Sequence, residues 1–110
     1  MMTDATTPVA TLKESMRVFA EARGWEPFHS PKNLAMALAS EVGELCEIFR
    51  WLTAEESRDA ADDPQLRIAI ADELADIANI VFLLSLHTRI DLTEAITAKV
   101  AKNAIKYPAP

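Results

Sequence analysis

The sequence predicts an all-α protein, a four-helix bundle formed by one domain over residues 1–110, with residues 1–7 as a flexible N-terminus. Half of the 110 residues are hydrophobic and a quarter are charged, which is typical of a folded globular chain large enough for one core. Only two glycines occur, against a typical share of about 7%. This scarcity disfavours folds with many tight turns and disfavours glycine-rich phosphate loops. No segment shows the polar–apolar alternation of a strand.

The first helix is predicted over residues 8–23. Thr7 is suited to cap its start, Pro8 fits the first helical position, and Gly24 is a typical residue for its end. An aromatic-rich loop, Trp25 to His29, follows.

The second helix is predicted to begin at Ser30-Pro31, by the same combination of cap and proline, and to run to about Leu52. Thr53 and Glu56 have the spacing of a capping box, which predicts a short helical turn. The acidic segment 58–63 then reads as a surface loop.

The third helix is predicted to begin at Asp63-Pro64 and to end near Thr88. Asp91 and Glu94 again have capping-box spacing, so a fourth helix should follow and end before Tyr107-Pro108. These four helices are the predicted bundle.

The charge and cysteine content exclude several classes of function. The formal net charge is −6, whereas binding of a nucleic-acid polymer usually needs a basic surface. An acidic chain that handles phosphates would need a metal ion. The single cysteine, Cys46, allows no internal disulfide and no cysteine-rich zinc site. No signal peptide is evident, and the longest apolar run, Ile77 to Leu86, is about half of a membrane span. We therefore expect a cytoplasmic protein with no membrane partner.

Two pairs of acids occupy matching places on the second and third helices. Glu41 and Glu73 lie in the middle of the apolar stripe of their helices, and Glu44 and Asp76 lie at its edge. Isolated carboxylates are costly in apolar surroundings, and four together repel one another. A divalent cation with oxygen ligands, Mg²⁺ or Mn²⁺, would relieve both costs. The alternative is that the acids pair with Lys or Arg, or lie in water at splayed helix ends.

Gly43 lies between the first two acids, inside a helix, where glycine costs about 1 kcal/mol relative to alanine. It indicates either close approach by another helix or substrate, or a small residue that is merely tolerated.

The sequence Glu41-Val42-Gly43-Glu44, followed by Glu73-Leu74-Ala75-Asp76, resembles the E-x-x-E…E-x-x-D signature of the MazG-like, all-α nucleotide pyrophosphohydrolases. The resemblance is strongest to the dCTP pyrophosphatase branch and covers the chain from about Leu12 to Pro108. Its further marks are Phe19-Ala20-Glu21, Arg23, Trp25, Phe28-His29, Asn33-Leu34, Phe49-x-Trp51 and Lys99-x-x-x-Asn103-x-x-Lys106-Tyr107-Pro108.

The resemblance implies Mg²⁺-dependent hydrolysis of a nucleoside triphosphate, dCTP or a modified dCTP, to the monophosphate and pyrophosphate, as house-cleaning of the nucleotide pool. Mn²⁺ would be a substitute metal. It also implies metal binding and catalysis by the four acids, with water attacking the α-phosphorus. Glu44 is a candidate for the proton acceptor. The acids concerned are Glu41, Glu44, Glu73 and Asp76.

The same resemblance implies a substrate pocket. Trp25 and Trp51 would stack the base, with Phe28 and His29 shaping the pocket, although tryptophans are more commonly core or interface anchors. Lys99, Asn103 and Lys106 would lie on the phosphate side; a solvated helix face is their alternative.

Two departures from the branch leave the substrate open. Ile80 replaces an aromatic residue, and Ala104-Ile105-Lys106 replaces an arginine-rich run. The alternatives are the same chemistry on dUTP, a purine or a damaged-base triphosphate, or a non-catalytic helical oligomer that binds a nucleotide or a partner. His87 lies on the apolar face and is expected to be a core or interface histidine.

The third helix is apolar on nearly all sides from Ile77 to Leu86, which requires burial on more than one face. One small chain has too few layers for that, so we expect a homo-oligomer. The resemblance implies a tetramer built as a dimer of dimers, with sites near subunit boundaries.

Overall fold

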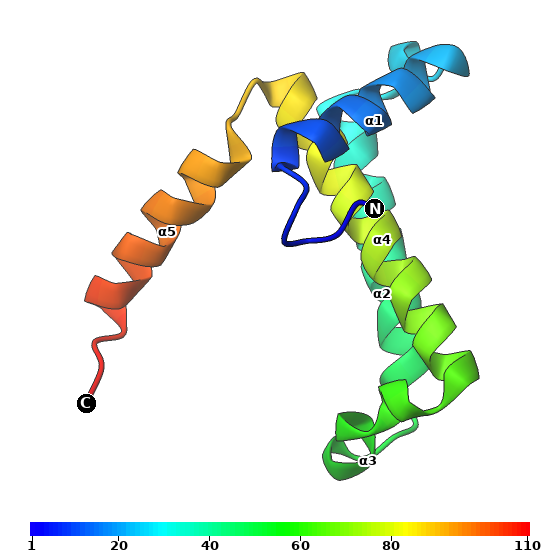
Figure 1. The fold of residues 1–110 in the computed structure, drawn as a ribbon, viewed down its shortest axis with the longest axis vertical. Coiled ribbons are helices and arrows are strands. Elements are labelled where there is room, and N and C mark those ends of the chain that lie inside the picture. Colours follow the sequence, from blue (N-terminus) through cyan, green and yellow to red (C-terminus); the bar gives the residue numbers. More distant parts are fainter.

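The computed structural model describes residues 1–110 and contains helices and connecting turns, with no strand. The predicted all-α class is therefore confirmed. The α-helices are α1 (Val9–Ala22), α2 (Pro31–Phe49), α3 (Ala54–Arg58), α4 (Pro64–Thr88) and α5 (Leu92–Lys106) (Figure 1). Two 3₁₀ turns, Glu26–Phe28 and Ala60–Asp62, lie in the loops before α2 and α4.

The predicted caps start three of the helices. The Ser30 hydroxyl accepts a hydrogen bond from the backbone N–H of Asn33 at the start of α2. The Asp63 carboxylate accepts from the first turn of α4, and the Asp91 carboxylate accepts from the N–H of Glu94 in α5. Each bond satisfies an N–H that has no partner within the helix. Polar side chains therefore set these boundaries locally.

The short helix α3 begins with the predicted capping box, in which Thr53 and Glu56 bond reciprocally. At α1 the predicted cap is wrong. Pro8 itself is the N-cap, and no side chain caps the helix. The segment before it forms a turn in which the N–H groups of Thr6 and Thr7 donate to the carbonyl of Thr3. This turn fixes the chain entering α1 without a contribution from the Thr7 side chain.

The ends of α1 and α2 place the two tryptophans differently. Gly24 has a φ of +65°, a left-handed conformation that glycine adopts at little cost. It turns the chain so that the Trp25 N–H donates to the carbonyl of Ala20. By contrast, α2 ends at Phe49 instead of continuing to Leu52 as predicted. Trp51 therefore lies in the turn beyond the helix.

The central unit is the pair α2 and α4, which lie side by side and run in opposite directions, with α1 packed across α4 (Figure 1). Ala20, Leu34 and Leu83, one residue from each helix, form the buried core. The predicted loop 58–63 contains the second 3₁₀ turn and buries Ala60. No helix is both long enough and apolar enough to cross a bilayer.

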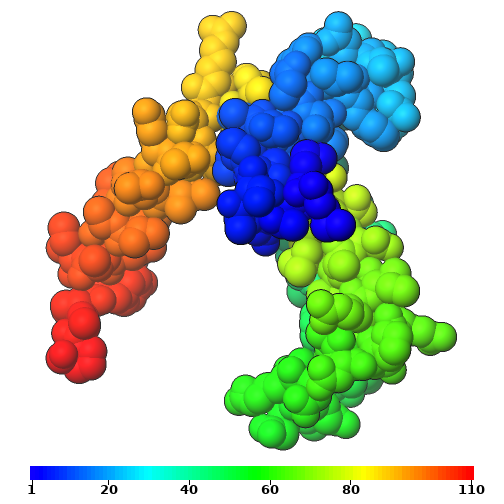
Figure 2. Space-filling model, viewed as in Figure 1, coloured from blue at the N-terminus to red at the C-terminus, as the bar shows by residue number.

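Helix α5 projects away from this unit, and open space separates it from α2 and α4 (Figure 2). A closed bundle is therefore not formed within one chain. The radius of gyration is 16.4 Å, against roughly 13 Å for a compact domain of this length. The accessible surface is 8450 Å², whereas a compact 12.1 kDa monomer exposes roughly 6000 Å².

Candidate functional site

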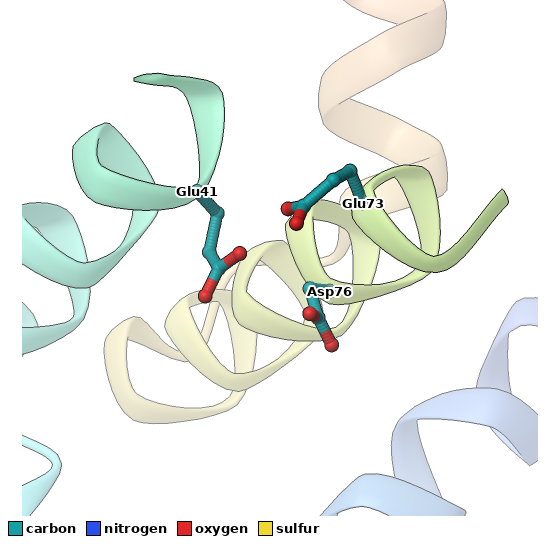
Figure 3. A group of neighbouring side chains, drawn as sticks. All are labelled: Glu41, Glu73 and Asp76. Carbon is teal, nitrogen blue, oxygen red and sulfur yellow. The ribbon is translucent and has the colours of Figure 1, made fainter. Parts of the chain in front are cut away.

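Three of the predicted acids meet between α2 and α4. Glu41 projects from α2 toward Glu73 and Asp76 on α4 (Figure 3). One carboxylate oxygen from each of the three lies within 4.8 Å of the others. The antiparallel packing of two apolar stripes, each with an acid at its centre, produces this cluster. The prediction that the two motifs would converge is therefore correct for these three residues.

The electrostatics of the cluster are unfavourable for four bare carboxylates. The Oε2 atom of Glu41 and the Oε2 atom of Glu73 are both buried, and when both side chains are ionised neither oxygen has a hydrogen-bond partner. When one is protonated, the two can share the proton, and this hydrogen bond with partial desolvation raises the pKa of Glu73 to about 7. The hydrogen bond with Glu73 lowers the pKa of Glu41, but Glu44, desolvation and the charge of Asp76 outweigh it, so that pKa is raised overall.

Glu44 is exposed beside the three acids. It is close enough to both Glu41 and Glu73 to affect their pKa. It does not belong to the group whose oxygens lie within 4.8 Å. The fourth acid of the motif therefore lies at the solvent side of the cluster.

The residues present fit a divalent metal ion. The donors are carboxylate oxygens, which suit Mg²⁺ or Mn²⁺, and the buried Oε2 atoms of Glu41 and Glu73 lack any other partner. The alternative of pairing with basic residues is not observed. The ion pairs of the chain join Arg17, Arg50 and Arg58 to other glutamates.

A cavity of about 670 Å³ begins at the acids and extends between α1, α2 and α4. Glu41 and Asp76 line one part of it, and Trp25 and His29 line another. A volume of this size is typical of small-molecule sites. The full lining is Met16, Phe19, Trp25, His29, Asn33, Leu34, Ala37, Glu41, Asp76, Asn79, Ile80 and Leu83.

The aromatic part of the cavity is built by edge-to-face contacts. The ring centroids of Phe19 and Trp25 lie 5.5 Å apart, those of Trp25 and His29 6.1 Å apart, and those of His29 and His87 6.2 Å apart. Nδ1 of His29 is buried without a partner. His87 is exposed, so it is not a core histidine within the single chain, because α4 is covered on too few sides at its C-terminal end; the alternative of an interface histidine stays a prediction.

Several predicted substrate residues lie elsewhere in the single chain. Phe28 is 70% exposed and Trp51 79% exposed, and neither lines the cavity. The Arg50 guanidinium lies over the Trp51 ring, 4.5 Å from its centroid. The predicted phosphate-side residues all lie on α5, which projects away from the acid cluster. They are Lys99, Asn103 and Lys106.

Two asparagines that line the cavity were not among the predicted site residues: Asn33 and Asn79. Nδ2 of Asn33 donates to the carbonyl of Phe28 at 2.9 Å, which ties the aromatic loop to α2. Asn79 interrupts the long apolar run of α4 one turn after Asp76. A polar residue at this place in an apolar helix is the feature of the sequence that could have indicated a site role for Asn79.

Gly43 has open space around it. A Cβ atom built there would meet no atom within 4 Å. Close approach by another helix of the same chain is therefore not its reason.

The known proteins that are similar to this chain agree with the family resemblance of its two acid motifs. No protein-family model matches the chain. It is 42% identical over 101 residues to dCTP pyrophosphatase 1 of Bos taurus, covering 89% of this chain and 60% of the relative. It is 40% identical over 106 residues to dCTP pyrophosphatase 1 of Homo sapiens, covering 94% and 62%. The chain thus spans about three fifths of the length of these curated relatives.

A crystal structure of a pyrophosphatase from Archaeoglobus fulgidus superimposes with a TM-score of 0.86 at 31% identity, covering 99% of this chain and all of that one. The likeness therefore includes the helices that carry the acids. Together with the two acid motifs and their convergence, it shows that the chain belongs to the MazG-like family of all-α nucleotide pyrophosphohydrolases.

Proposed function

We propose that the protein hydrolyses a nucleoside triphosphate to the monophosphate and pyrophosphate, with Mg²⁺ held by Glu41, Glu73 and Asp76. The observation that carries the proposal is the cluster itself. Three carboxylates meet within 4.8 Å, with two buried oxygens that have no partner, at a cavity with an aromatic wall. A metal ion held by the acids can bind the triphosphate while the base stacks on the aromatic rings.

In the reaction, water attacks the α-phosphorus, the bond to the bridging oxygen breaks, and pyrophosphate leaves. When bound, Mg²⁺ supplies positive charge against the phosphate oxygens. Glu44, exposed beside the cluster, is the carboxylate that we assign to accept the proton of the attacking water. Trp25 and His29 hold the base at the other part of the cavity, which orients the phosphates toward the acids.

For the substrate we propose dCTP or a modified dCTP, supported by the relatives named as dCTP pyrophosphatases. The test is a panel of triphosphates with Mg²⁺ that contains dCTP, 5-methyl-dCTP, dUTP, dGTP and 8-oxo-dGTP, scored for pyrophosphate release. We expect the highest kcat/KM for the cytosine nucleotides. A preference for dUTP or a purine nucleotide would change the proposed substrate but leave the proposed reaction unchanged. Binding without turnover would indicate a non-catalytic module.

We also propose that the working form is a homo-oligomer, a tetramer built as a dimer of dimers. The excess surface of the single chain is roughly 2400 Å² relative to a compact monomer, more than the ~800 Å² per partner of a standard interface. An adjacent subunit would then bring Phe28, Trp51 and the polar residues of α5 to a site: Lys99, Asn103 and Lys106. Light scattering after gel filtration measures the mass, and a monomer of 12.1 kDa would contradict this assembly.

The cytoplasmic location stays a prediction, which fractionation of cells that express the natural protein would test.

A further inference from the structure

Asn79 lies at a distinct level of the cavity wall. It follows Asp76 by three residues on α4, which is about 4.5 Å along the helix axis. Leu83, at the buried end of the same wall, follows Asp76 by about 10.5 Å. All three residues line the cavity. Along α4, Asn79 is therefore between the acids and Leu83.

The aromatic rings lie beyond Asn79 along the same direction. His29 contacts His87 with ring centroids 6.2 Å apart, and His87 is a further turn past Leu83 on α4. Trp25 in turn contacts His29. Along α4 the order is thus acids, Asn79, then rings. In a nucleotide the order is phosphates, pentose, then base.

Asn79 is chemically free to bind a ligand. Its side chain is half-buried at the cavity wall, and its amide makes no hydrogen bond within the protein, although Ser85 and Thr88 farther along α4 bond to backbone carbonyls. Asn33 differs, because its amide is already engaged by the carbonyl of Phe28. An asparagine amide can both donate and accept. A hydroxyl group needs that same combination.

We infer that Asn79 binds the 3′-hydroxyl group of the substrate pentose and thereby sets the preference for deoxyribose over dideoxyribose nucleotides. This inference rests on the proposed function and adds a specificity residue to it. Ile80, the next residue, supplies an apolar neighbour on the same wall. The amide of Asn79 would otherwise face the sugar without a partner, and a partly desolvated unpaired group is unfavourable.

The test compares Asn79→Leu with the wild type on CTP, dCTP and 2′,3′-dideoxy-CTP, measuring kcat/KM from pyrophosphate release. Leucine has the branched shape of asparagine, with methyl groups in place of the amide, and favours a helix. The wild type should prefer the substrate that carries the bound hydroxyl by roughly three- to tenfold, as expected of one hydrogen bond. The step in kcat/KM should lie between dCTP and the dideoxy compound, which lacks the 3′-hydroxyl; a step that lies only between CTP and dCTP would overturn the inference.

In Asn79→Leu this step should fall to within about twofold. Asn79→Ala, which removes the amide without adding bulk, should do the same. Ile80→Leu is the matched control, because it changes the shape of the same wall but no hydrogen bond, and it should leave the step unchanged. A wild type with no step, or a step that survives both Asn79 substitutions, would overturn the inference while leaving the pyrophosphohydrolase proposal intact. No pyrophosphate from any nucleotide with the wild type would overturn both.

Discussion

The α2–α4 pair and helix α5 are opposite cases within one chain. The pair buries apolar residues against each other and brings three acids to one point. Helix α5 packs little on the rest of the chain and leaves Ile96 and Val100 more than half exposed. The acidic half of the proposed phosphate site is thus assembled within a single chain. The basic half, predicted on α5, is presented outward.

The comparison separates two kinds of surface. Carboxylates at the centre of an apolar stripe are explained by a metal that the same chain can hold. Apolar residues on a helix with no neighbour in its own chain would be covered by a second chain in the proposed oligomer. Substitutions in the acid cluster should therefore lower catalytic activity, whereas substitutions on the apolar face of α5 should disrupt assembly.

The largest effect is expected for Glu41→Gln. It removes one charged oxygen donor from the cluster, and metal-ion stabilisation of phosphoryl transfer is worth several kcal/mol. We expect kcat/KM for pyrophosphate release to fall at least about 100-fold, with the oligomer intact. Glu47→Gln is the control, because Glu47 is an exposed acid on the same helix that pairs with Arg50. Equal activity of Glu41→Gln and wild type would exclude the cluster from catalysis.

The next effect concerns the unpaired helix. Ile96→Asp combined with Val100→Asp places two charges on the apolar face of α5. If a second subunit covers that face, each lost side chain removes about 1.5–3 kcal/mol of burial, and the mass in light scattering should drop to a smaller species. Ala98→Asp, on the other side of the helix, is the control and should keep the mass. An unchanged mass for the double variant would show that another surface mediates assembly.

Removing the metal should make stability depend on pH. Glu73 has a pKa of about 7 in the folded chain, above its ordinary value of 4.5. The folded state then binds a proton more tightly than the unfolded state, so stability in EDTA should fall as pH rises from about 4.5 to about 7. Melting temperatures across that range, with and without Mg²⁺, measure this. Mg²⁺ should restore stability at pH 8, and Glu73→Gln should flatten the metal-free profile; a profile equally steep in that variant would contradict the assignment.

The smallest effect is expected for Gly43→Ala. The position is helical and open, so alanine should stabilise the chain by about 1 kcal/mol. Chemical denaturation at fixed protein concentration measures the change. A destabilised variant with a lower oligomeric mass would instead mean that a partner subunit approaches Gly43 closely.

Much of the fold is readable locally in the sequence. Ser30, Asp63 and Asp91 mark helix starts because a side-chain oxygen next to a helical run satisfies its first N–H groups. The facing of Glu41 and Glu73 is also readable, because both lie at the centre of an apolar stripe and two such stripes pack together. The caps and the apolar stripes depend on residues within a few positions of one another, and only the packing of the two stripes brings distant residues together.

Other features depend on contacts that no local pattern encodes. The end of α2 at Phe49 leaves Trp51 outside the helix, and the direction of α5 follows from the short connection after Thr88. Asn79 is a single polar residue in an apolar run, and its place between acids and rings emerges only when α4 lies against α1 and α2. The single chain therefore supplies the acids and part of the pocket, and in the proposed oligomer a neighbouring subunit would supply the remainder of the predicted site.

The most direct test of the central claim is hydrolysis of dCTP with Mg²⁺ in ¹⁸O-labelled water, followed by mass spectrometry of the products. Attack at the α-phosphorus predicts one ¹⁸O atom in the monophosphate and unlabelled pyrophosphate. Release of orthophosphate, or ¹⁸O in the pyrophosphate, would contradict the assignment of the Glu41–Glu73–Asp76 cluster to pyrophosphohydrolysis.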